Sequence, residues 1–178
     1  MSNDNANGNI AEAPPRSGRF RAMVRAGENV TAYLRTGNGK PVILLRIADH
    51  HDRLWALTLE HLSLGYRVIL PEIAPDPASL DDWFAAFHDG LGIGAASLVV
   101  DDNYAVPATR LALAHGSRIE RVVFVSTRSS TGEQVGALTN AWSSESHPLL
   151  VIAGQEPVDE VAKRIVAFLR EGETGAAT

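Results

Sequence analysis

The chain has 178 residues, and 45% of them are apolar. This is enough for one globular domain with a hydrophobic core that needs no disulfide or metal ion to hold it together. It contains no cysteine, which excludes disulfide and thiolate chemistry and favours a cytoplasmic location. The formal charge of −5 argues against a nucleic-acid surface, and no apolar run approaches the roughly 18 residues that a membrane span needs. We therefore expect a soluble protein with no nucleic-acid or membrane partner.

Residues 1–17 are rich in Asn, Gly, Ala and Pro and have little to bury, which predicts a disordered leader. A single domain is expected over residues 18–171, followed by a flexible tail over 172–178. Within the domain, segments 19–25 and 29–35 alternate apolar and polar residues around a turn, which is typical of an antiparallel hairpin. The arginines of the first segment, Arg19, Arg21 and Arg25, are then expected on the solvent face of a strand.

Strand and helix patterns alternate in the rest of the chain. The predicted strands are 41–47, 66–73, 96–100, 121–126 and 148–154, and the predicted helices are 52–65, 79–92, 104–115 and 157–170. The polar stretch 127–147 is expected to be irregular, and Ser79 is expected to cap the second helix. This alternation predicts an α/β fold with right-handed crossovers and a mostly parallel, doubly wound sheet that follows an N-terminal antiparallel hairpin.

Several site templates are absent from this pattern. Gly90, Gly92 and Gly94 precede a strand, whereas the glycines of a dinucleotide site follow one, and there is no Walker-type phosphate loop. No lysine follows a late strand, as a phospho-acceptor receiver domain would require. The run Asp49–Asp52 contains two histidines and two aspartates, but neighbours in sequence do not converge on one ion. We therefore expect no metal site and no cofactor.

Several segments carry a family resemblance. They are "VTAYLRTGNGKPVILL", "GYRVILPEI", "LGIGAASLVV" and "RLALAHGSRIERVVFVS". From Val30 to Phe168 their order resembles that of the α/β-hydrolase superfamily, especially the branch of haloalkane dehalogenases, epoxide hydrolases and related esterases. The resemblance implies a minimal α/β-hydrolase-like fold, with the cap reduced to about twenty residues and the final strand missing.

The resemblance also implies where a nucleophile would stand. The family's Gly-x-Ser-x-Gly turn, which carries a carboxylate in one branch, corresponds to Val100–Tyr104 and puts Asp102 in the nucleophile's place. Val100 and Tyr104 replace the two glycines that leave room for the strained turn. We therefore expect a relaxed turn in which Asp101 or Asp102 caps the following helix.

The oxyanion segment departs from the family in the same way. Arg46 and Ile47 stand where the family has His-Gly, and a β-branched residue cannot adopt the backbone conformations open to glycine. An oxyanion hole is therefore not expected, and Arg46 is expected to form an ion pair with Asp101 or Asp102 across neighbouring strand ends. Arg46, Ile47, Asn103 and Tyr104 would then line the remnant of a pocket.

The general base is missing from its family position. The catalytic histidine would follow the final strand, and none of the six histidines stands there. We expect an α/β-hydrolase-like protein without hydrolase activity that acts as a binding or interaction module. An exposed sheet edge would take a second copy or another protein, or the remnant pocket would take a small hydrophobic ligand.

The alternative is an active hydrolase of esters, epoxides or haloalkanes. In that case Asp102 would be the nucleophile, Asp101 would lie beside it, and His50 or His51 would serve as a relocated base. Arg46 or the N–H of Asn103 would stabilise the developing charge.

Overall fold

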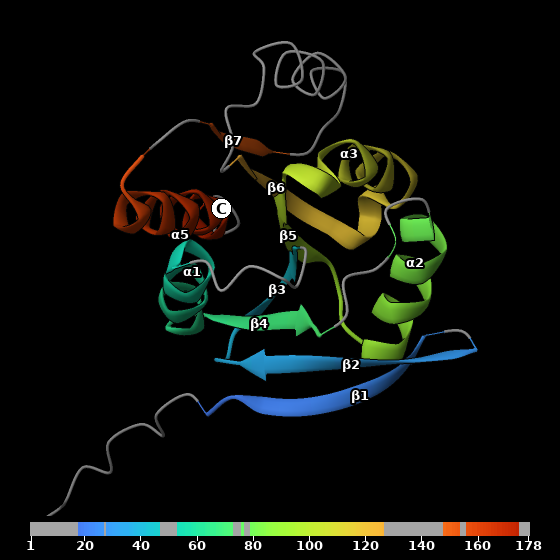
Figure 1. Ribbon diagram of the computed structural model, residues 1–178. Helices are drawn as coiled ribbons and strands as arrows, with labels where there is room; N and C mark the ends of the chain where they lie inside the picture. Colours follow the sequence, from blue (N-terminus) through green and yellow to red (C-terminus); the bar gives the residue numbers. More distant parts are fainter. Residues whose placement is uncertain are drawn as a thin grey trace, which may run out of the picture.

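A seven-stranded sheet runs through the protein, with helices on both of its faces (Figure 1). The computed structural model describes residues 18–26, 28–46, 53–72, 76, 79–126, 148–153 and 156–174. The strands are β1 (Phe20–Ala26), β2 (Asn29–Thr36), β3 (Lys40–Leu45), β4 (Tyr66–Pro71), β5 (Ala96–Asp101), β6 (Ile119–Ser126) and β7 (Leu149–Ala153). Their order in the sheet is β1-β2-β4-β3-β5-β6-β7.

The sheet is mostly parallel, as the sequence predicts. Strands β3, β4, β5, β6 and β7 pair in parallel, whereas β1 and β2 form an antiparallel hairpin that joins β4 through an antiparallel β2–β4 pair. Residues 127–148 connect β6 to β7. Within the described residues there is no cap domain and no strand after β7, so the predicted minimal fold is confirmed.

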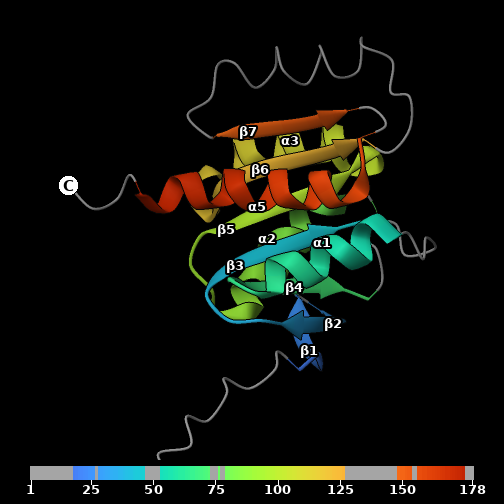
Figure 2. The ribbon, with the colours of Figure 1, turned by 90° about the vertical axis from the view of Figure 1, so that its left-hand side faces the viewer.

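Four helices cover the sheet in the described part of the chain. They are α1 (Arg53–Ser63), α2 (Leu80–Leu91), α3 (Ala105–Ala114) and α5 (Val158–Thr174), with short 3₁₀ turns η2 (Asp102–Tyr104) and η3 (Gly116–Arg118). Helices α1 and α5 lie on one face and α2 and α3 on the other (Figures 1 and 2). None of these helices combines the length and apolar character of a membrane span.

The central strands are buried on both faces and separate two apolar cores. On β3, Ile43 and Leu45 face the helices α2 and α3, while Val42 and Leu44 face α1 and α5. Each of these four side chains is at most 1% exposed. Burying a side chain of this size contributes about 1.5–3 kcal/mol, so the continuous apolar runs of the sequence became the two-sided core of the sheet.

Some predicted boundaries differ from the observed ones. β6 begins at Ile119, two residues before the predicted start. Ile119 pairs with Ala96 of β5, and a register shift separates this pair from the regular pairing that begins at Leu98 and Val122. The helix expected over 104–115 begins with η2 and becomes α-helical at Ala105. The helix expected to end at Arg170 continues to Thr174.

Ser79 does not make the predicted capping bond. It occupies the N-cap position of α2, but its backbone has a φ of −110° and a ψ of 19°, which is outside the extended region of a capping residue. Its hydroxyl instead donates to the carbonyl oxygen of Asp76 over 3.4 Å. The acidic side chains Asp81 and Asp82 do lie in the first turn of α2, where the helix dipole favours negative charge.

Candidate functional site

The carboxyl ends of β3, β5 and β6 gather the polar residues that the sequence singles out. Leu45 pairs with Val100, so Arg46 follows β3 beside the end of β5, where Asp101 stands. Asp101 pairs in turn with Val125, which places Ser126 at the end of the next strand. Asp101 and Ser126 are buried. In open α/β sheets this edge is where ligands bind, so it is the candidate site.

Several predicted site residues lie outside the described part of the chain. These are Ile47, His50 and His51, together with the run Asp49–Asp52, and the side chain of Asp102 is also outside it. The predicted ion pair between Arg46 and Asp101 or Asp102 stays a prediction, although the strand register brings Arg46 and Asp101 to neighbouring strand ends.

Asp101 caps the turn that follows β5. Its Oδ1 accepts a hydrogen bond from the backbone N–H of Asn103 over 3.0 Å and lies 3.4 Å from Asn103 Nδ2. The residue is extended, with a φ of −88° and a ψ of 179°, as is typical of a capping position. The predicted capping role of Asp101 is therefore confirmed, and this carboxylate oxygen is engaged with the backbone of the chain itself.

The backbone of the turn is relaxed. A nucleophile elbow presents its nucleophile on a strained turn between strand and helix. Here Asp102 begins the 3₁₀ turn η2, and every described residue with a positive φ is a glycine. The Asp102 backbone therefore does not adopt the left-handed conformation that would mark strain at this position.

Tyr104 fills the place where the family has its second glycine. Its side chain is 1% exposed and packs within the core between the sheet and helices α2 and α3. Burial, with the negative charges of Asp101 and Asp76, raises the pKa of the Tyr104 phenol to about 12. The hydroxyl is therefore protonated at neutral pH and cannot serve as a base there.

Asp76 is a neighbour of this site that sequence reasoning missed. It contributes to the raised pKa of Tyr104, although it lies in the connection between β4 and α2. No local pattern marks it, because its approach to Tyr104 depends on how two segments far apart in the chain pack together.

A cavity beside the turn is too small for a substrate. It is lined by apolar side chains of β5, β6, β7 and α3, among them Val100, Ala105 and Phe124, and has a volume of about 10 Å³. That is room for about one water molecule. The described residues around η2 are therefore packed against one another at this point.

The three described histidines lie at the other end of the sheet. His61 and His88 are in the last turns of α1 and α2, and His115 follows α3. In parallel β-α-β units the helices return toward the amino ends of the strands, so these residues are remote from Asp102. None of the three is placed to act as its base.

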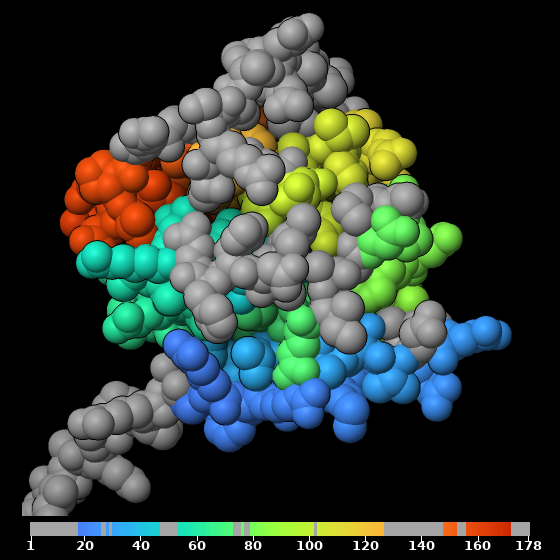
Figure 3. Space-filling view, viewed as in Figure 1, coloured from blue at the N-terminus to red at the C-terminus, as the bar shows by residue number. Residues whose placement is uncertain are grey.

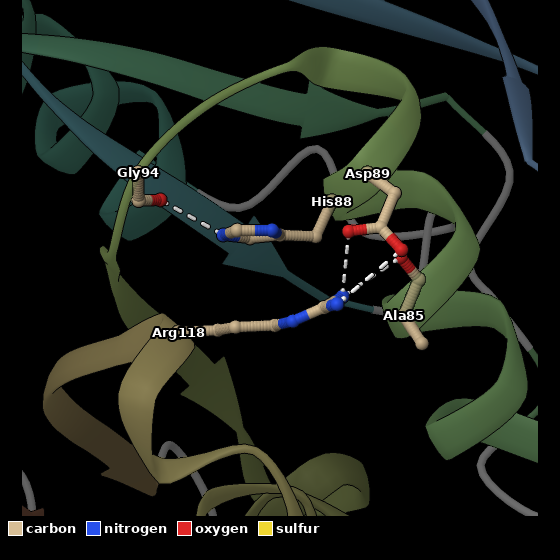
Figure 4. Close-up of polar contacts among 5 residues, drawn as sticks. All are labelled: Ala85, His88, Asp89, Gly94 and Arg118. Atoms are coloured by element: carbon tan, nitrogen blue, oxygen red, sulfur yellow. Dashed lines mark hydrogen bonds and ion pairs between the residues drawn. The ribbon is translucent and has the colours of Figure 1, made fainter.

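His88 has a structural role at that end. It is 5% exposed, and its Nε2 lies 2.8 Å from the carbonyl oxygen of Gly94, to which it donates a hydrogen bond because a carbonyl can only accept (Figure 4). Burial lowers the pKa of His88 below its ordinary value of 6.5. The nearby Arg118 forms an ion pair with Asp89 at 2.9 Å and donates to the carbonyl oxygen of Ala85 over 3.2 Å.

Among the described residues, no group of three His, Asp or Glu side chains is arranged to hold a metal ion.

Comparisons with known proteins place the chain by its fold. No protein-family model matches the sequence, and a search of curated proteins finds no match. Solved structures do match. An epoxide hydrolase from Vigna radiata is 23% identical, with a TM-score of 0.51, and the match covers 60% of this chain and 40% of that enzyme.

Two further structures extend the comparison. A 2-hydroxy-6-oxo-6-phenylhexa-2,4-dienoate hydrolase from Rhodococcus sp. strain RHA1 is 14% identical, with a TM-score of 0.53 and coverage of 62% of this chain and 47% of that one. A predicted CIB-like hydrolase from Thermoplasma acidophilum is 11% identical, with a TM-score of 0.66, and the match covers 87% of this chain and 99% of that one. The chain thus spans less than half the length of the first two enzymes, whereas it matches nearly all of the third. The resemblance in the sequence and the order of the strands agree with these matches, and the chain has the α/β-hydrolase fold.

Proposed function

We propose that this protein is an α/β-hydrolase-fold protein without hydrolase activity that works as a binding or interaction module. The observation that carries the proposal is the turn after β5. Asp101 caps it, η2 continues it without a strained residue, and Tyr104 fills the space of the missing glycine. An elbow that holds an attacking carboxylate needs the opposite arrangement, with small neighbours and a strained backbone.

The chemistry of the second step supports the same proposal. A carboxylate nucleophile forms an ester with its substrate, and a base must then activate water to hydrolyse that ester. The described histidines lie toward the amino ends of the parallel strands, opposite the end where Asp102 stands, and the Tyr104 phenol is protonated at neutral pH. The described residues thus offer no base to Asp102.

A hydrolase screen tests the proposal. The purified protein would be assayed with short-chain p-nitrophenyl esters, an epoxide and a haloalkane, beside Asp102→Asn and the control Asp82→Asn. Asp82 is a suitable control because it is an exposed acid on α2. We expect no turnover above the buffer in any of the three proteins. Turnover that is lost in Asp102→Asn and kept in Asp82→Asn would overturn the proposal and make Asp102 a nucleophile.

A further inference from the structure

The β1–β2 hairpin extends the sheet beyond β4 and is held firmly on one face by α2. Trp83 Nε1 donates to Thr31 Oγ1 over 3.3 Å, and the rings of Tyr33 and Phe87 pack edge to face with their centroids 5.9 Å apart. Gly90 approaches β1 so closely that a Cβ atom there would lie 2.3 Å from the carbonyl oxygen of Arg25. The hairpin is therefore a preorganised part of the fold.

The opposite face of the hairpin is open within the described structure. Six side chains share this face by the strand register, and we call them the open hairpin face: Arg21, Met23, Arg25, Val30, Ala32 and Leu34. Met23 is 72% exposed and Val30 is 60% exposed. Helix α1 packs over the core formed with β3 and β4. Of the six side chains of the open hairpin face, only Leu34 packs against this core. Figure 2 shows α1 and α5 lying over the central strands, with β1 and β2 beyond them.

Strand β1 is also an edge of the sheet. It stands first in the strand order, so one side of its backbone pairs with β2 and the other has no strand partner among the described residues. Figure 3 shows the residues of the hairpin along the lower rim of the molecule. A seven-residue edge strand presents a row of backbone donors and acceptors to any extended chain that comes alongside.

The charge of this edge selects the partner. Residues 18–36 contain four arginines and one glutamate, although the whole chain has a formal charge of −5. Arg21 is held by Glu72 through two bonds of 2.5 and 2.7 Å. Arg25 forms no ion pair with any described acidic residue. A basic strand on an acidic protein favours an acidic partner and disfavours another surface like its own.

A second copy of the chain fits this edge poorly. If two β1 strands paired antiparallel about Met23, Arg21 of each copy would stand directly opposite Arg25 of the other. Like charges placed directly opposite on neighbouring strands destabilise the pair. An acidic segment of a different protein would instead place a carboxylate opposite Arg25, which has no ion pair among the described residues.

We propose that an acidic, extended segment of a partner protein binds along β1 and adds a strand to the sheet. One acidic side chain would lie beside Arg25 and a second near Arg21, which already pairs with Glu72, and an apolar side chain between them would cover Met23. This inference rests on the proposed function, because it names the chemistry of the partner that an interaction module of this fold would take.

A peptide titration tests the inference. The probe is a seven-residue peptide that matches the length of β1, with threonine alternating with glutamate, valine and glutamate. The comparison peptide carries lysine in place of glutamate. Binding to the ¹⁵N-labelled full chain would be followed by NMR at low salt. We expect chemical-shift changes centred on residues 20–26, at least about tenfold tighter binding of the glutamate peptide, and weakening of that binding in high salt.

Variants of the protein complete the test. Arg25→Glu should weaken binding of the glutamate peptide by at least about tenfold, whereas Arg110→Glu, which changes an exposed arginine on α3 by the same charge, should leave it unchanged. Absence of binding to the wild type, equal binding of both peptides, equal binding by Arg25→Glu, or shift changes confined to other strands would each overturn the inference. A dimer in light scattering that Met23→Lys abolishes would overturn it in favour of a second copy.

The two proposals fail separately. A protein that hydrolyses a substrate through Asp102 and still binds the glutamate peptide at β1 would overturn the proposed function and support the docking edge. A protein that is silent in the hydrolase screen and ignores the peptide would overturn the docking edge alone.

Discussion

The carboxylate of Asp101 and the backbone N–H of Asn103 are joined by a hydrogen bond of 3.0 Å. An active α/β-hydrolase presents its nucleophile one residue later, at the position of Asp102. Asp101 itself starts the 3₁₀ turn η2. Asp101 thus has a structural role at the start of the turn, and its contribution can be measured as stability.

Removal of this cap should destabilise the protein. We expect Asp101→Ala to lower the free energy of unfolding by about 0.5–2 kcal/mol, because the N–H of Asn103 loses its acceptor. Asp101→Asn keeps an acceptor oxygen and should cost less. Urea denaturation of the three proteins measures both values. Equal stability of Asp101→Ala and the wild type would contradict the capping role.

Tyr104 should behave as a core residue. Tyr104→Ala should cost about 3–5 kcal/mol, because it leaves a cavity in the core beneath α2 and α3. Tyr104→Phe keeps the ring and should cost about 1 kcal/mol. The comparison is made by chemical denaturation. A small loss in Tyr104→Ala would mean that the ring does not support the core.

His88 should make the protein less stable in acid. The net effect of its surroundings is to lower the pKa of His88, and burial is the largest cause. The charges of Arg118 and His115 act in the same direction, whereas the hydrogen bond to Gly94 and the charge of Asp89 oppose it. The unfolded chain therefore binds a proton more readily than the folded one as the pH falls below about 6.5, so stability is present above that pH and decreases below it. The slope from this one group cannot exceed about 1.4 kcal/mol per pH unit.

The His88→Gln variant isolates this contribution. Glutamine has no charge to gain, so its free energy of unfolding should depend less steeply on pH than that of the wild type between about pH 6.5 and 5. Thermal or urea denaturation across that range measures the two slopes. Parallel curves would show that His88 titrates alike in the folded and unfolded states.

Two glycines with positive φ should respond differently to substitution. Gly37 has a φ of 71°, and a Cβ there would lie 2.2 Å from the carbonyl oxygen of Tyr66, whereas Gly92 has a φ of 59° and faces open space. Gly37→Ala should cost well over 2 kcal/mol, since strain and a backbone clash act together, and Gly92→Ala should cost about 1–2 kcal/mol. Similar losses in denaturation experiments on the two variants would contradict the difference in packing.

The fold could be predicted from the sequence because its strongest signals are local. The apolar run of β3 and the spacing of Val161 and Ile165 in α5 reflect burial that each segment repeats along its own length. The capping role of Asp101 was likewise predictable from its place between strand and helix.

Other features depend on contacts between distant segments. Ser79 has the residue type of a cap, yet the ψ of the backbone at that position prevents capping. The influence of Asp76 on Tyr104 comes from a separate connection. Such features arise only when the whole chain is packed, so no pattern in a short window could predict them.

The two-sided burial of β3 also has a consequence for how the sheet selects its alignment. A strand with one polar face would expose its apolar residues if it slipped by one position, but β3 has Val42, Ile43, Leu44 and Leu45 in succession and would present an apolar side chain to each core in either alignment. The pairing register of β3 must therefore be fixed by contacts outside the strand. The turn before β3 makes such contacts, because Gly37 and Gly39 pack closely against the carbonyl oxygens of Ser63, Gly65 and Tyr66, where β4 begins.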